Sequence, residues 1–534
     1  MSITRSFQSG LTVLLLGLAL SPAAIMAAPA AAPSDGAALI RSYCSGCHFE
    51  HDNFGHDGKF ERINTIRKTP EGWVMTLFRM RQVHGLVLED AVHDSIVRYL
   101  ADTQGLAPSE SAAGRFALER RPNAQDMDVG PEIGVMCGRC HSLARVALQR
   151  RDEEEWRKLA HTHVGLWTSI EYSASGRDRP WWQIASGPLP AKLAALYPLS
   201  TTAWTDWKAR PARDLTGNWV VSGHMPGGKD FFGEARINRE EGGGYEAAYQ
   251  LTDVTGFEFA GDSKALFYTN YEWRGSAQVR DRSLREVFAL SEDGNRISGR
   301  WFDSEHAEEG GEWTAIREGG AAEVLALFPQ SLRAGSTTLV TMVGNGLAST
   351  RGAPASFGDT AKVTVVQNEA KLVRVLVKLA ANATPGMRKV STGGATGAVA
   401  VYTQIDQIDV VPAYAIARLG GGKVAPVAAQ FEAMASTRLP NGELLPLGPM
   451  TADWTTIPFD AEAKRTEDDK YAGHFDARGL FLPSAAGPNP AREFSGDNVG
   501  NLTVVARAID GSRAVEGRGH LVVTVQRWIT PPIY

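Results

Sequence analysis

Cysteine is scarce in this chain of 534 residues, which contains only four of them. All four fall in two short motifs of the same form, Cys44-Ser45-Gly46-Cys47-His48 and Cys137-Gly138-Arg139-Cys140-His141. Once these motifs are committed to one chemistry, no cysteine is left to form a disulfide bond elsewhere. The remainder of the chain must therefore be held together by core packing alone.

A strong charge of one sign is also missing. The 60 acidic residues nearly balance the 55 basic ones, which argues against binding to nucleic acid or to an anionic membrane surface. Beyond the N-terminal segment, no apolar run reaches the roughly 20 residues that a membrane-spanning helix needs. We therefore expect a mature protein that binds neither nucleic acid nor a membrane.

Motifs for self-contained catalysis are absent as well. The sequence has no Gly-rich phosphate loop before a predicted helix, no G-x-S-x-G elbow and no H-E-x-x-H zinc helix. No catalytic residue is predicted on this chain. This absence suggests that the chain is one component of a larger enzyme.

The two cysteine motifs have the form C-x-x-C-H, which is the attachment signature of a c-type haem. The two thiols bond to the vinyl groups of the porphyrin, and the histidine becomes the proximal ligand of the iron. The predicted haem-binding residues are Cys44, Cys47 and His48 for the first haem and Cys137, Cys140 and His141 for the second. The alternative is a pair of C-x-x-C redox or zinc sites with a chance histidine after each. Repetition of the motif with no cysteine left over favours two covalently attached haems.

Two predicted helices that follow the motifs supply candidate distal ligands. In the first helix Trp73 and Met80 share one face, and in the second Trp156 and His163 have the same spacing. When Trp73 is aligned with Trp156, Met80 falls on His163, which indicates an internal duplication. We predict Met80 as the distal ligand of the first iron and His163 as that of the second.

Other residues compete for both positions. His84 or His93 could bind the first iron if Met80 is ordinary core, and His161 competes with His163 from a different helix face. Methionine and histidine ligands would separate the two reduction potentials, because a thioether favours reduced iron.

The first 32 residues resemble a secretory signal peptide. Arg5 gives the positive start, Leu11 to Leu20 is apolar, and small residues near Ala27 to Ala30 offer cleavage sites. Export fits the haems, since c-type attachment is completed outside the cytoplasm in bacteria. We predict a periplasmic protein, with an uncleaved membrane anchor as the alternative.

The apolar pattern changes along the chain from helical spacing to the two-residue alternation of strands. Helices are predicted over 35–43, 72–83, 88–100, 132–137 and from 152 onward, with one short helix over 191–197 in the Trp- and Pro-rich segment 176–211. The predicted fold class is multidomain, with an all-α di-haem cytochrome c domain followed by three antiparallel β domains. The predicted parts are a signal peptide (1–32), the di-haem domain (33–211), an antiparallel β-barrel (212–322), an immunoglobulin-like β-sandwich (323–408) and a second such sandwich (409–534).

The order of these parts resembles the large (alpha) subunit of quinohaemoprotein amine dehydrogenase. The resemblance is carried by the two C-x-x-C-H motifs, the barrel opening Leu215-Thr216-Gly217-Asn218-Trp219 and the two immunoglobulin-like units, and it covers essentially the whole mature chain. It implies a heterotrimer with a β-propeller subunit and a small subunit that carries cysteine tryptophylquinone. It also implies one methionine-ligated and one bis-histidine haem.

The resemblance further implies a division of labour. Primary amines would be oxidised to aldehydes with release of ammonia at the quinone of the partner subunit. Electrons would then pass through the two haems to an external periplasmic copper protein or cytochrome c. Two other functions fit the sequence: a free-standing di-haem electron carrier or peroxidase relative with β docking domains, and a non-enzymatic surface protein.

Overall fold

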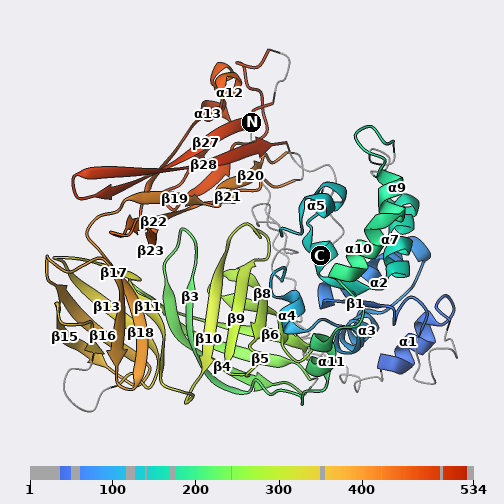
Figure 1. Ribbon diagram of the computed structural model, residues 1–534, viewed down its shortest axis with the longest axis horizontal. Helices are drawn as coiled ribbons and strands as arrows, with labels where there is room; N and C mark the ends of the chain where they lie inside the picture. The colour runs from blue at the N-terminus through green and yellow to red at the C-terminus, as the bar shows by residue number, and fades with distance from the viewer. Residues whose placement is uncertain are drawn as a thin grey trace, which may run out of the picture.

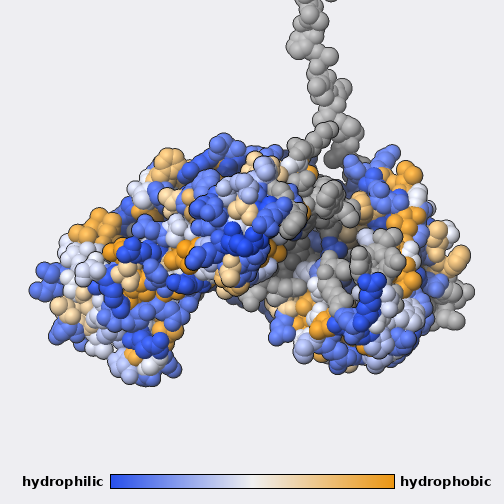
Figure 2. All heavy atoms as spheres, turned by 90° about the horizontal axis from the view of Figure 1, so that it is seen from above, coloured by the Kyte–Doolittle hydropathy of each residue, from blue (hydrophilic) through white to orange (hydrophobic). Residues whose placement is uncertain are grey.

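The computed structural model describes residues 36–49, 60–115, 127–138, 141–167, 170, 173, 175–241, 243–348, 355–421, 424–493 and 497–525. The predicted signal peptide and Cys140 lie outside these ranges. Figure 1 shows a helical region at one end of the molecule, a barrel beside it, and two further β units. In Figure 2 the helical region forms a lobe of its own, and mostly hydrophilic side chains cover the visible surface. None of the described helices is long and apolar enough to cross a membrane.

Short helices, each with local start and stop signals, build the helical region. Helix α2 (Pro70–His84) begins after Thr69, whose hydroxyl accepts a hydrogen bond from the first turn, and ends at Gly85, where φ is 71°. Helix α7 (Glu153–Leu166) begins in the same way after the side chain of Asp152. The other helices of the first part are α1 (Gly36–Cys44), α3 (Asp90–Thr103), α4 (Pro108–Ser111), α5 (Pro131–Cys137) and α6 (Ala144–Ala147).

The segment from 176 to 211 holds more helix than predicted. Instead of one short helix it contains α9 (Trp181–Ser186), α10 (Pro188–Leu196) and α11 (Thr202–Lys208). Trp204 and Trp207 of α11 are buried in the apolar cluster of the neighbouring barrel. These tryptophans therefore pack between the helical region and the barrel.

The prediction of an all-α haem domain is wrong. Strands β1 (Ile66–Lys68) and β2 (Gln149–Arg151) pair antiparallel inside the helical region, with Arg67 opposite Arg150. Among the residues that the structure describes, 44% lie in strands and 22% in helices, so this part of the protein is mostly β. Each of the two strands has only three residues, which is too short for a two-residue alternation to be recognised, and they pair across a large separation in sequence.

The helical region has two apolar cores, one for each motif. In the first half (36–115), Trp73 and Leu77 of α2 are buried against α1 and α3, and Cys44 packs at the edge of this cluster. In the second half (127–197), Trp156 of α7 is buried against α5, α9 and α10, and Cys137 packs at the edge. Each predicted haem motif therefore shares a core with the helix that carries its predicted distal ligand.

The predicted barrel is confirmed. Eight consecutive antiparallel strands close on themselves because β10 pairs with β3, and the opening Trp219 is fully buried inside. The strands are β3 (Gly217–His224), β4 (Phe231–Arg239), β5 (Tyr245–Asp253), β6 (Glu258–Tyr268), β7 (Glu272–Val279), β8 (Arg282–Leu290), β9 (Arg296–Asp303) and β10 (Gly310–Arg317).

Aromatic side chains fill the barrel around one buried carboxyl group. Glu286 accepts hydrogen bonds from Tyr249 Oη (2.7 Å), Ser263 Oγ (2.6 Å) and Trp273 Nε1 (2.8 Å). Burial raises the pKa of Glu286, although these three donors oppose the shift. The interior is therefore a packed core rather than an open channel.

The β units that follow are not purely antiparallel, which corrects the second part of the predicted fold class. Strand β12 pairs parallel with β18, and β20 pairs parallel with β28. The first unit holds β11 (Glu323–Phe328), β12 (Ser331–Arg333), β13 (Thr337–Asn345), β14 (Ala355–Ser356), β15 (Ala361–Asn368), β16 (Leu372–Leu379), β17 (Gly386–Thr392) and β18 (Ala395–Tyr402). They form two four-stranded sheets, β11-β13-β16-β15 and β12-β18-β17-β14.

The last unit has three sheets, β19-β22-β23, β20-β28-β27-β24 and β21-β26-β25. Its strands and helices are β19 (Gln407–Val411), β20 (Tyr414–Arg418), β21 (Ala429–Gln430), β22 (Glu432–Arg438), β23 (Leu444–Met450), β24 (Asp453–Pro458), α12 (Ala461–Arg465), α13 (Asp468–Tyr471), β25 (Gly473–Phe475), β26 (Leu480–Pro483), β27 (Gly500–Asp510) and β28 (Arg513–Thr524). His224 of the barrel reaches this unit, with Nε2 2.7 Å from Glu432 Oε1.

The helical region is fastened to the barrel through its first half. Glu71 at the start of α2 forms an ion pair with Arg274 of β7. Asp102 of α3 accepts a hydrogen bond from the Thr269 amide at 2.6 Å. These contacts fix the position of α2 and α3, and with them the first motif, relative to the β part of the molecule.

Candidate haem-binding sites

The first motif lies at the C-terminal end of α1. The amides of Cys47 and His48 donate to the carbonyl of Cys44 at 3.1 and 2.9 Å, so the chain continues in one turn through the motif. His48 Nδ1 lies 3.0 Å from the carbonyl oxygen of Glu61. Because a carbonyl can only accept, Nδ1 carries the proton and Nε2 is left free to bind a metal.

Burial favours the protonated thiol at Cys44 and at Cys137. Burial raises the pKa of Cys44 to about 11, and the nearby Cys47 adds to the shift. Burial alone raises the pKa of Cys137 to about 11. No disulfide joins the cysteines that the structure describes. These thiols are thus available for thioether bonds to a porphyrin.

Three residues are candidates for the distal iron ligand of the first site. Met80 is half-buried in α2, the helix whose Trp73 packs with Cys44 in one core. His84, in the last turn of α2, is exposed, whereas His93 of α3 is half-buried, with Nδ1 2.9 Å from Asp94 Oδ1. Met80 therefore stays a prediction, with His84 and His93 as its alternatives.

The second motif follows α5 and is described except for Arg139 and Cys140. His141 Nδ1 lies 2.8 Å from the carbonyl oxygen of Ser142. The proton is therefore on Nδ1, as in His48, and the lone pair of the ring is on Nε2. The same arrangement holds for His163 of α7, whose Nδ1 lies 2.8 Å from the carbonyl of Leu159.

His141 and His163 face each other across the second site. Their ring centres are 6.4 Å apart, and the ring planes are tilted by 37°. With metal–imidazole bonds of about 2.0 Å and each nitrogen about 1.1 Å from its own ring centre, two imidazoles on opposite sides of one metal have centres about 6 Å apart. Burial lowers the pKa of His163, and the charges of Arg79 and Arg151 add to this, which favours the neutral imidazole that a metal requires. The pair fits bis-histidine ligation of a haem iron.

His161, the alternative ligand, is placed differently. It is exposed, and its ring packs edge-on against Trp182 with the ring centres 4.8 Å apart. Of the two histidines of α7, it is therefore His163 that the fold turns toward His141. Among the described residues, no group of three or more His, Cys, Asp or Glu side chains is arranged to hold a metal ion.

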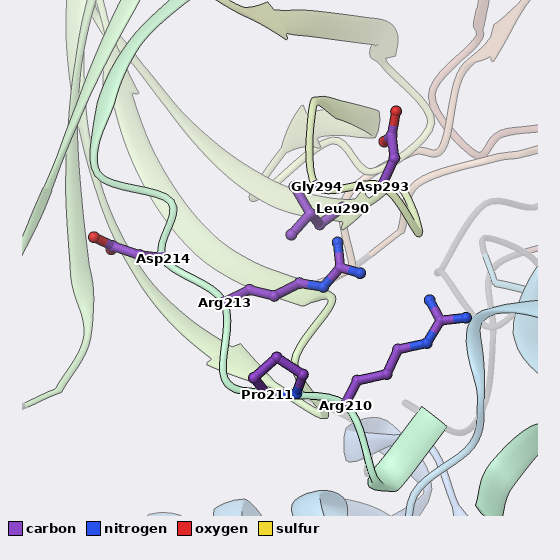
Figure 3. Close-up of a pocket in the computed structure, with 7 residues that line it drawn as sticks. All are labelled: Arg210, Pro211, Arg213, Asp214, Leu290, Asp293 and Gly294. Atoms are coloured by element: carbon purple, nitrogen blue, oxygen red, sulfur yellow. The ribbon is translucent and has the colours of Figure 1, made fainter. Parts of the chain in front are cut away.

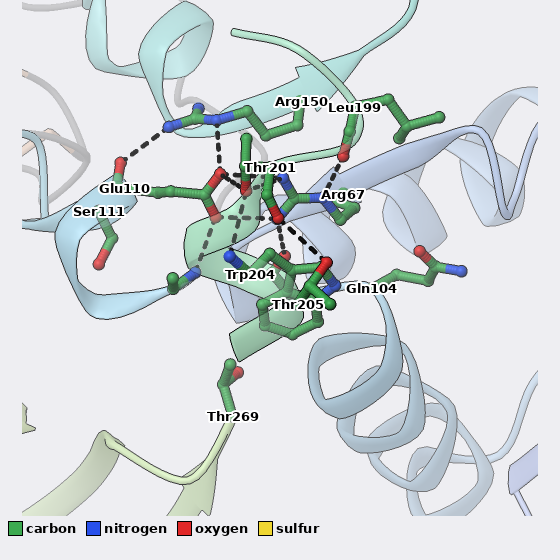
Figure 4. A network of polar contacts seen from close by, with 12 residues as sticks. Arg67, Gln104, Glu110, Ser111, Arg150, Leu199, Thr201, Trp204, Thr205 and Thr269 are labelled. Atoms are coloured by element: carbon green, nitrogen blue, oxygen red, sulfur yellow. Dashed lines mark hydrogen bonds and ion pairs between the residues drawn. The ribbon is translucent and has the colours of Figure 1, made fainter. Parts of the chain in front are cut away.

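A buried polar network joins the two halves of the helical region (Figure 4). Arg67 of β1 donates to both carboxylate oxygens of Glu110 at 2.9 Å, and Arg150 of β2 donates to the same carboxylate at 3.2 Å. The hydroxyl of Thr201 donates a further hydrogen bond to Glu110 at 2.9 Å. Burial alone would raise the pKa of Glu110, but the hydrogen bonds and charges of the arginines lower it to about 2. The network fixes β1, β2 and α4 relative to one another, and so the two haem motifs.

The sequence analysis missed this network, although a signal was present. If the alignment of Trp73 with Trp156 is extended toward the N-terminus, Arg67 and Lys68 fall on Arg150 and Arg151. Paired basic residues before each buried tryptophan are unusual at positions that precede a core helix. No comparable local pattern marks Glu110.

A cavity of about 490 Å³ lies away from these residues, at the turn that leads from α11 into the barrel (Figure 3). Arg210 and Arg213 line it, but Arg210 is paired with Glu292, and Arg213 donates to the Ser291 carbonyl. Both guanidinium groups also stack on Trp207. These contacts hold the turn between α11 and the barrel in place. None of the residues that line the cavity is a candidate haem ligand, so the cavity is not part of the candidate haem sites.

Comparison with protein-family models gives four matches that follow one another along the chain. The model described as "Quinohemoprotein amine dehydrogenase A, alpha subunit, haem binding" matches residues 34–204. The models for alpha subunit domains II, III and IV of the same enzyme match 212–318, 321–403 and 408–533. No curated protein matches the chain.

The following solved structures match parts of the chain. A redesigned β-barrel, mFAP1, bound to DFHBI is 15% identical and covers 19% of this chain and 94% of its own, with a TM-score of 0.18. MucB is 11% identical over 34% of this chain and 94% of its own, with a TM-score of 0.12. Drosophila N-cadherin EC1-4 is 10% identical over 60% of this chain and 94% of its own, with a TM-score of 0.15.

Proposed function

This chain belongs to the family of quinohemoprotein amine dehydrogenase alpha subunits, and we propose that it is the two-haem electron-transfer subunit of a periplasmic amine dehydrogenase. The family makes it a haem-binding subunit of a multi-subunit oxidoreductase. The observation that carries the finer proposal is the facing pair His141 and His163, with ring centres 6.4 Å apart, next to a C-x-x-C-H motif.

Three tasks fall to residues of this chain. Cys44 and Cys47 would hold one haem, and Cys137 and Cys140 the other, by thioether bonds. A haem bound at such a site takes up and releases one electron at its iron. Hydrogen bonds from Nδ1 to backbone carbonyls orient His48, His141 and His163, so that the lone pair on Nε2 of each would be the one to bind iron.

The amine chemistry is assigned to a partner. This chain has no cysteine outside the haem motifs, so it cannot supply the cysteine of a cross-linked tryptophylquinone. We place that cofactor on a small partner subunit, beside a β-propeller subunit, in a heterotrimer that oxidises primary amines to aldehyde and ammonia. Electrons would leave the chain for an external periplasmic copper protein or cytochrome c. The periplasmic location and the signal peptide 1–32 belong to the same proposal.

The distal ligands give the first test. We expect His163→Ala to convert one of two low-spin haems to a high-spin haem that binds cyanide, because the iron then lacks its sixth protein ligand. His161→Ala, two residues away on the same helix, should leave both haem spectra unchanged. The assignment fails if His161→Ala, and not His163→Ala, creates the cyanide-binding haem.

The function itself is tested by reconstitution. The isolated chain, matured with haem, should be reduced by dithionite but not by a primary amine, whereas the complex purified with its partners should show amine-dependent haem reduction. Reduction of the isolated chain by amine would contradict the division of labour. A pyridine haemochrome spectrum without covalently bound haem would contradict the haem assignment. An oxidised wild-type protein that binds cyanide would favour a peroxidase relative instead.

A further inference from the structure

Basic side chains gather between the two halves of the helical region with too few carboxylates to balance them. We propose that four of them, Lys68, Arg79, Arg145 and Arg151, bind the propionate carboxylates of the haem held between His141 and His163 and raise its reduction potential. This inference rests on the proposed function, because it requires a haem at the second motif.

The cluster begins at a shared hydroxyl group. Thr76 Oγ1 of α2 accepts a hydrogen bond from Lys68 Nζ at 2.6 Å and another from Arg79 Nη2 at 3.3 Å. The hydroxyl itself donates to the Gly72 carbonyl at 2.8 Å. Two cationic groups therefore converge on one neutral oxygen atom, which satisfies a hydrogen bond from each but cancels neither charge.

The charged amino group of Lys68 is unusual because its side chain is buried. Its side chain is only 5% exposed and lies over the Trp73 ring at 5.3 Å. Burial lowers the pKa of Lys68 well below its ordinary value, and the charges of Arg151 and Arg79 lower it further, against a smaller opposing effect of Glu155. An anion bound at this point would reverse the shift.

Arg79 and Arg145 extend the cluster without a counter-charge. Burial lowers the pKa of Arg79, and the charge of Arg145 adds to the shift, so the two guanidinium groups lie near each other. Burial also lowers the pKa of Arg145 on α6. Among the carboxylates that the structure describes, none lies within ion-pair distance of either arginine. Both arginines are half-buried, and an anion placed between them would offset the repulsion of their like charges.

The one carboxylate of the cluster is already shared. Glu155 is 2% exposed and lies 3.5 Å from Arg151 Nη1 and 3.2 Å from Lys158 Nζ. Arg62 approaches the same carboxylate at 3.9 Å. One buried carboxylate cannot balance the cations that surround it, so the cluster keeps a positive charge.

The position of the cluster selects the second haem. The charges of Arg79 and Arg151 both lower the pKa of His163, which faces His141. Arg79 belongs to the first half of the helical region and Arg151 to the second. In a c-type haem the vinyl groups are fixed by the cysteines, and the two propionates leave the opposite edge of the ring. Arginine pairs with carboxylates through two parallel hydrogen bonds and keeps its charge when buried, which suits this edge.

The proposed consequence is electrostatic. A positive charge close to the iron favours the ferrous state, which carries one positive charge less than the ferric state. A single cation about 10 Å from the iron, at an effective dielectric constant near 20, changes the equilibrium constant for reduction by roughly tenfold. For a one-electron couple a tenfold change corresponds to 59 mV.

The test is a spectroelectrochemical titration of the mature two-haem chain. Arg79→Gln and Arg145→Gln should each lower the potential of the bis-histidine haem by about 59 mV, because each removes one cation beside a propionate. Arg81→Gln is the matched control, since Arg81 lies on the same helix but is exposed and pairs only loosely with Asp90 at 3.9 Å. Its potentials should equal those of the wild type. Arg79→Lys keeps the charge and should restore most of the shift.

Three results would overturn the inference. The first is equal potentials in Arg79→Gln, Arg145→Gln and the control. The second is a shift confined to the other haem, which would assign the cluster to the first motif. The third is a shift that occurs only in the complex and not in the isolated chain, which would assign the carboxylate to a partner subunit. Haem content distinguishes these failures from failure of the proposed function: a wild-type chain with two covalent haems keeps that function, whereas one without covalent haem loses both.

Discussion

The two halves of the helical region have one scaffold and different surroundings. Each half carries a C-x-x-C-H motif, a three-residue strand ending in a basic residue, a capped helix and a buried tryptophan one turn into that helix. Because Arg67 lies directly opposite Arg150 in the β1–β2 pair, the two halves meet at equivalent residues, as around a two-fold axis. The two halves therefore share the arrangement of motif, strand and helix that we propose for haem binding.

The two halves differ in the predicted distal ligand and in the contacts and charges that surround it. The position that holds Met80 in the first half holds His163 in the second. The first half is bound to the barrel through Glu71 and Asp102, and it contributes Arg79 to the cationic cluster beside His163. Two sites with one architecture could thus give two bound haems different reduction potentials through one ligand and a few charges, without a change of fold.

The largest expected effect comes from removing the carboxylate that both halves share. Glu110→Gln should lower the free energy of unfolding of the helical region by about 3 kcal/mol, because Arg67 and Arg150 are then buried without a counter-charge. Denaturant unfolding followed by Soret circular dichroism measures this loss. Glu154→Gln is the control: its carboxylate is exposed, so the substitution should cost far less than Glu110→Gln. Equal losses in the two variants would show that the network does not hold the halves together.

The lowered pKa of Glu110 leads us to expect that the stability of the helical region depends on pH. The pKa of Glu110 is about 2 in the folded chain against an ordinary value of 4.5, so the unfolded chain binds the proton more tightly. The stabilisation is therefore complete above about pH 5 and is lost as the pH falls toward 2, by about 3 kcal/mol in total. In Glu110→Gln this part of the pH profile should be flat. A variant that retains the wild-type slope would assign the titration to another group.

The equivalent tryptophans should respond unequally. Trp73 Nε1 donates to the Gln104 carbonyl at 3.2 Å, whereas Trp156 Nε1 has no hydrogen-bond partner in the structure. Replacement by phenylalanine removes similar apolar area from both cores, so Trp73→Phe should cost about 1 kcal/mol more than Trp156→Phe. Unfolding of the two single variants under the same conditions measures the difference. A larger cost at Trp156 would contradict the assigned bonding.

The smallest effect concerns the two helix caps. Asp152→Ala should destabilise α7 by about 1 kcal/mol, because the amide of Glu155 loses the 2.7 Å bond to the capping side chain. Asp152→Thr, which introduces the cap of the first half, should recover more than half of this and lose only the charge effect at the helix start. If threonine is no better than alanine, the caps of the two halves are not equivalent.

Local patterns in the sequence predicted much of the helical region. The C-x-x-C-H spacing marked both motifs, and proline or a capping side chain placed the starts of α2 and α7 within two residues of their observed positions. The barrel was predicted because its strands follow one another in order, so that the two-residue alternation and the turns repeat along the chain. In each case the signal and the structure lie within a few residues of each other.

Contacts between distant residues were not predictable in this way. The β1–β2 pair joins residues 66–68 to 149–151, and the parallel pair β20–β28 joins residues 414–418 to 520–524. Neither pairing leaves a local pattern, and both overturned the predicted fold class. The choice between His161 and His163 depended on helix register, and the ring contacts show which of them turns toward His141.

The sequence alone determined the two C-x-x-C-H motifs, because five adjacent residues contain every group that thioether attachment of a haem needs. Which imidazole stands across from another, and how many positive charges surround it, depends on segments that meet only after folding. The reason is the distance over which each interaction acts. Haem attachment and helix caps involve residues within one turn of the chain, whereas the burial of a side chain and the electrostatic potential at it depend on all of its neighbours in space.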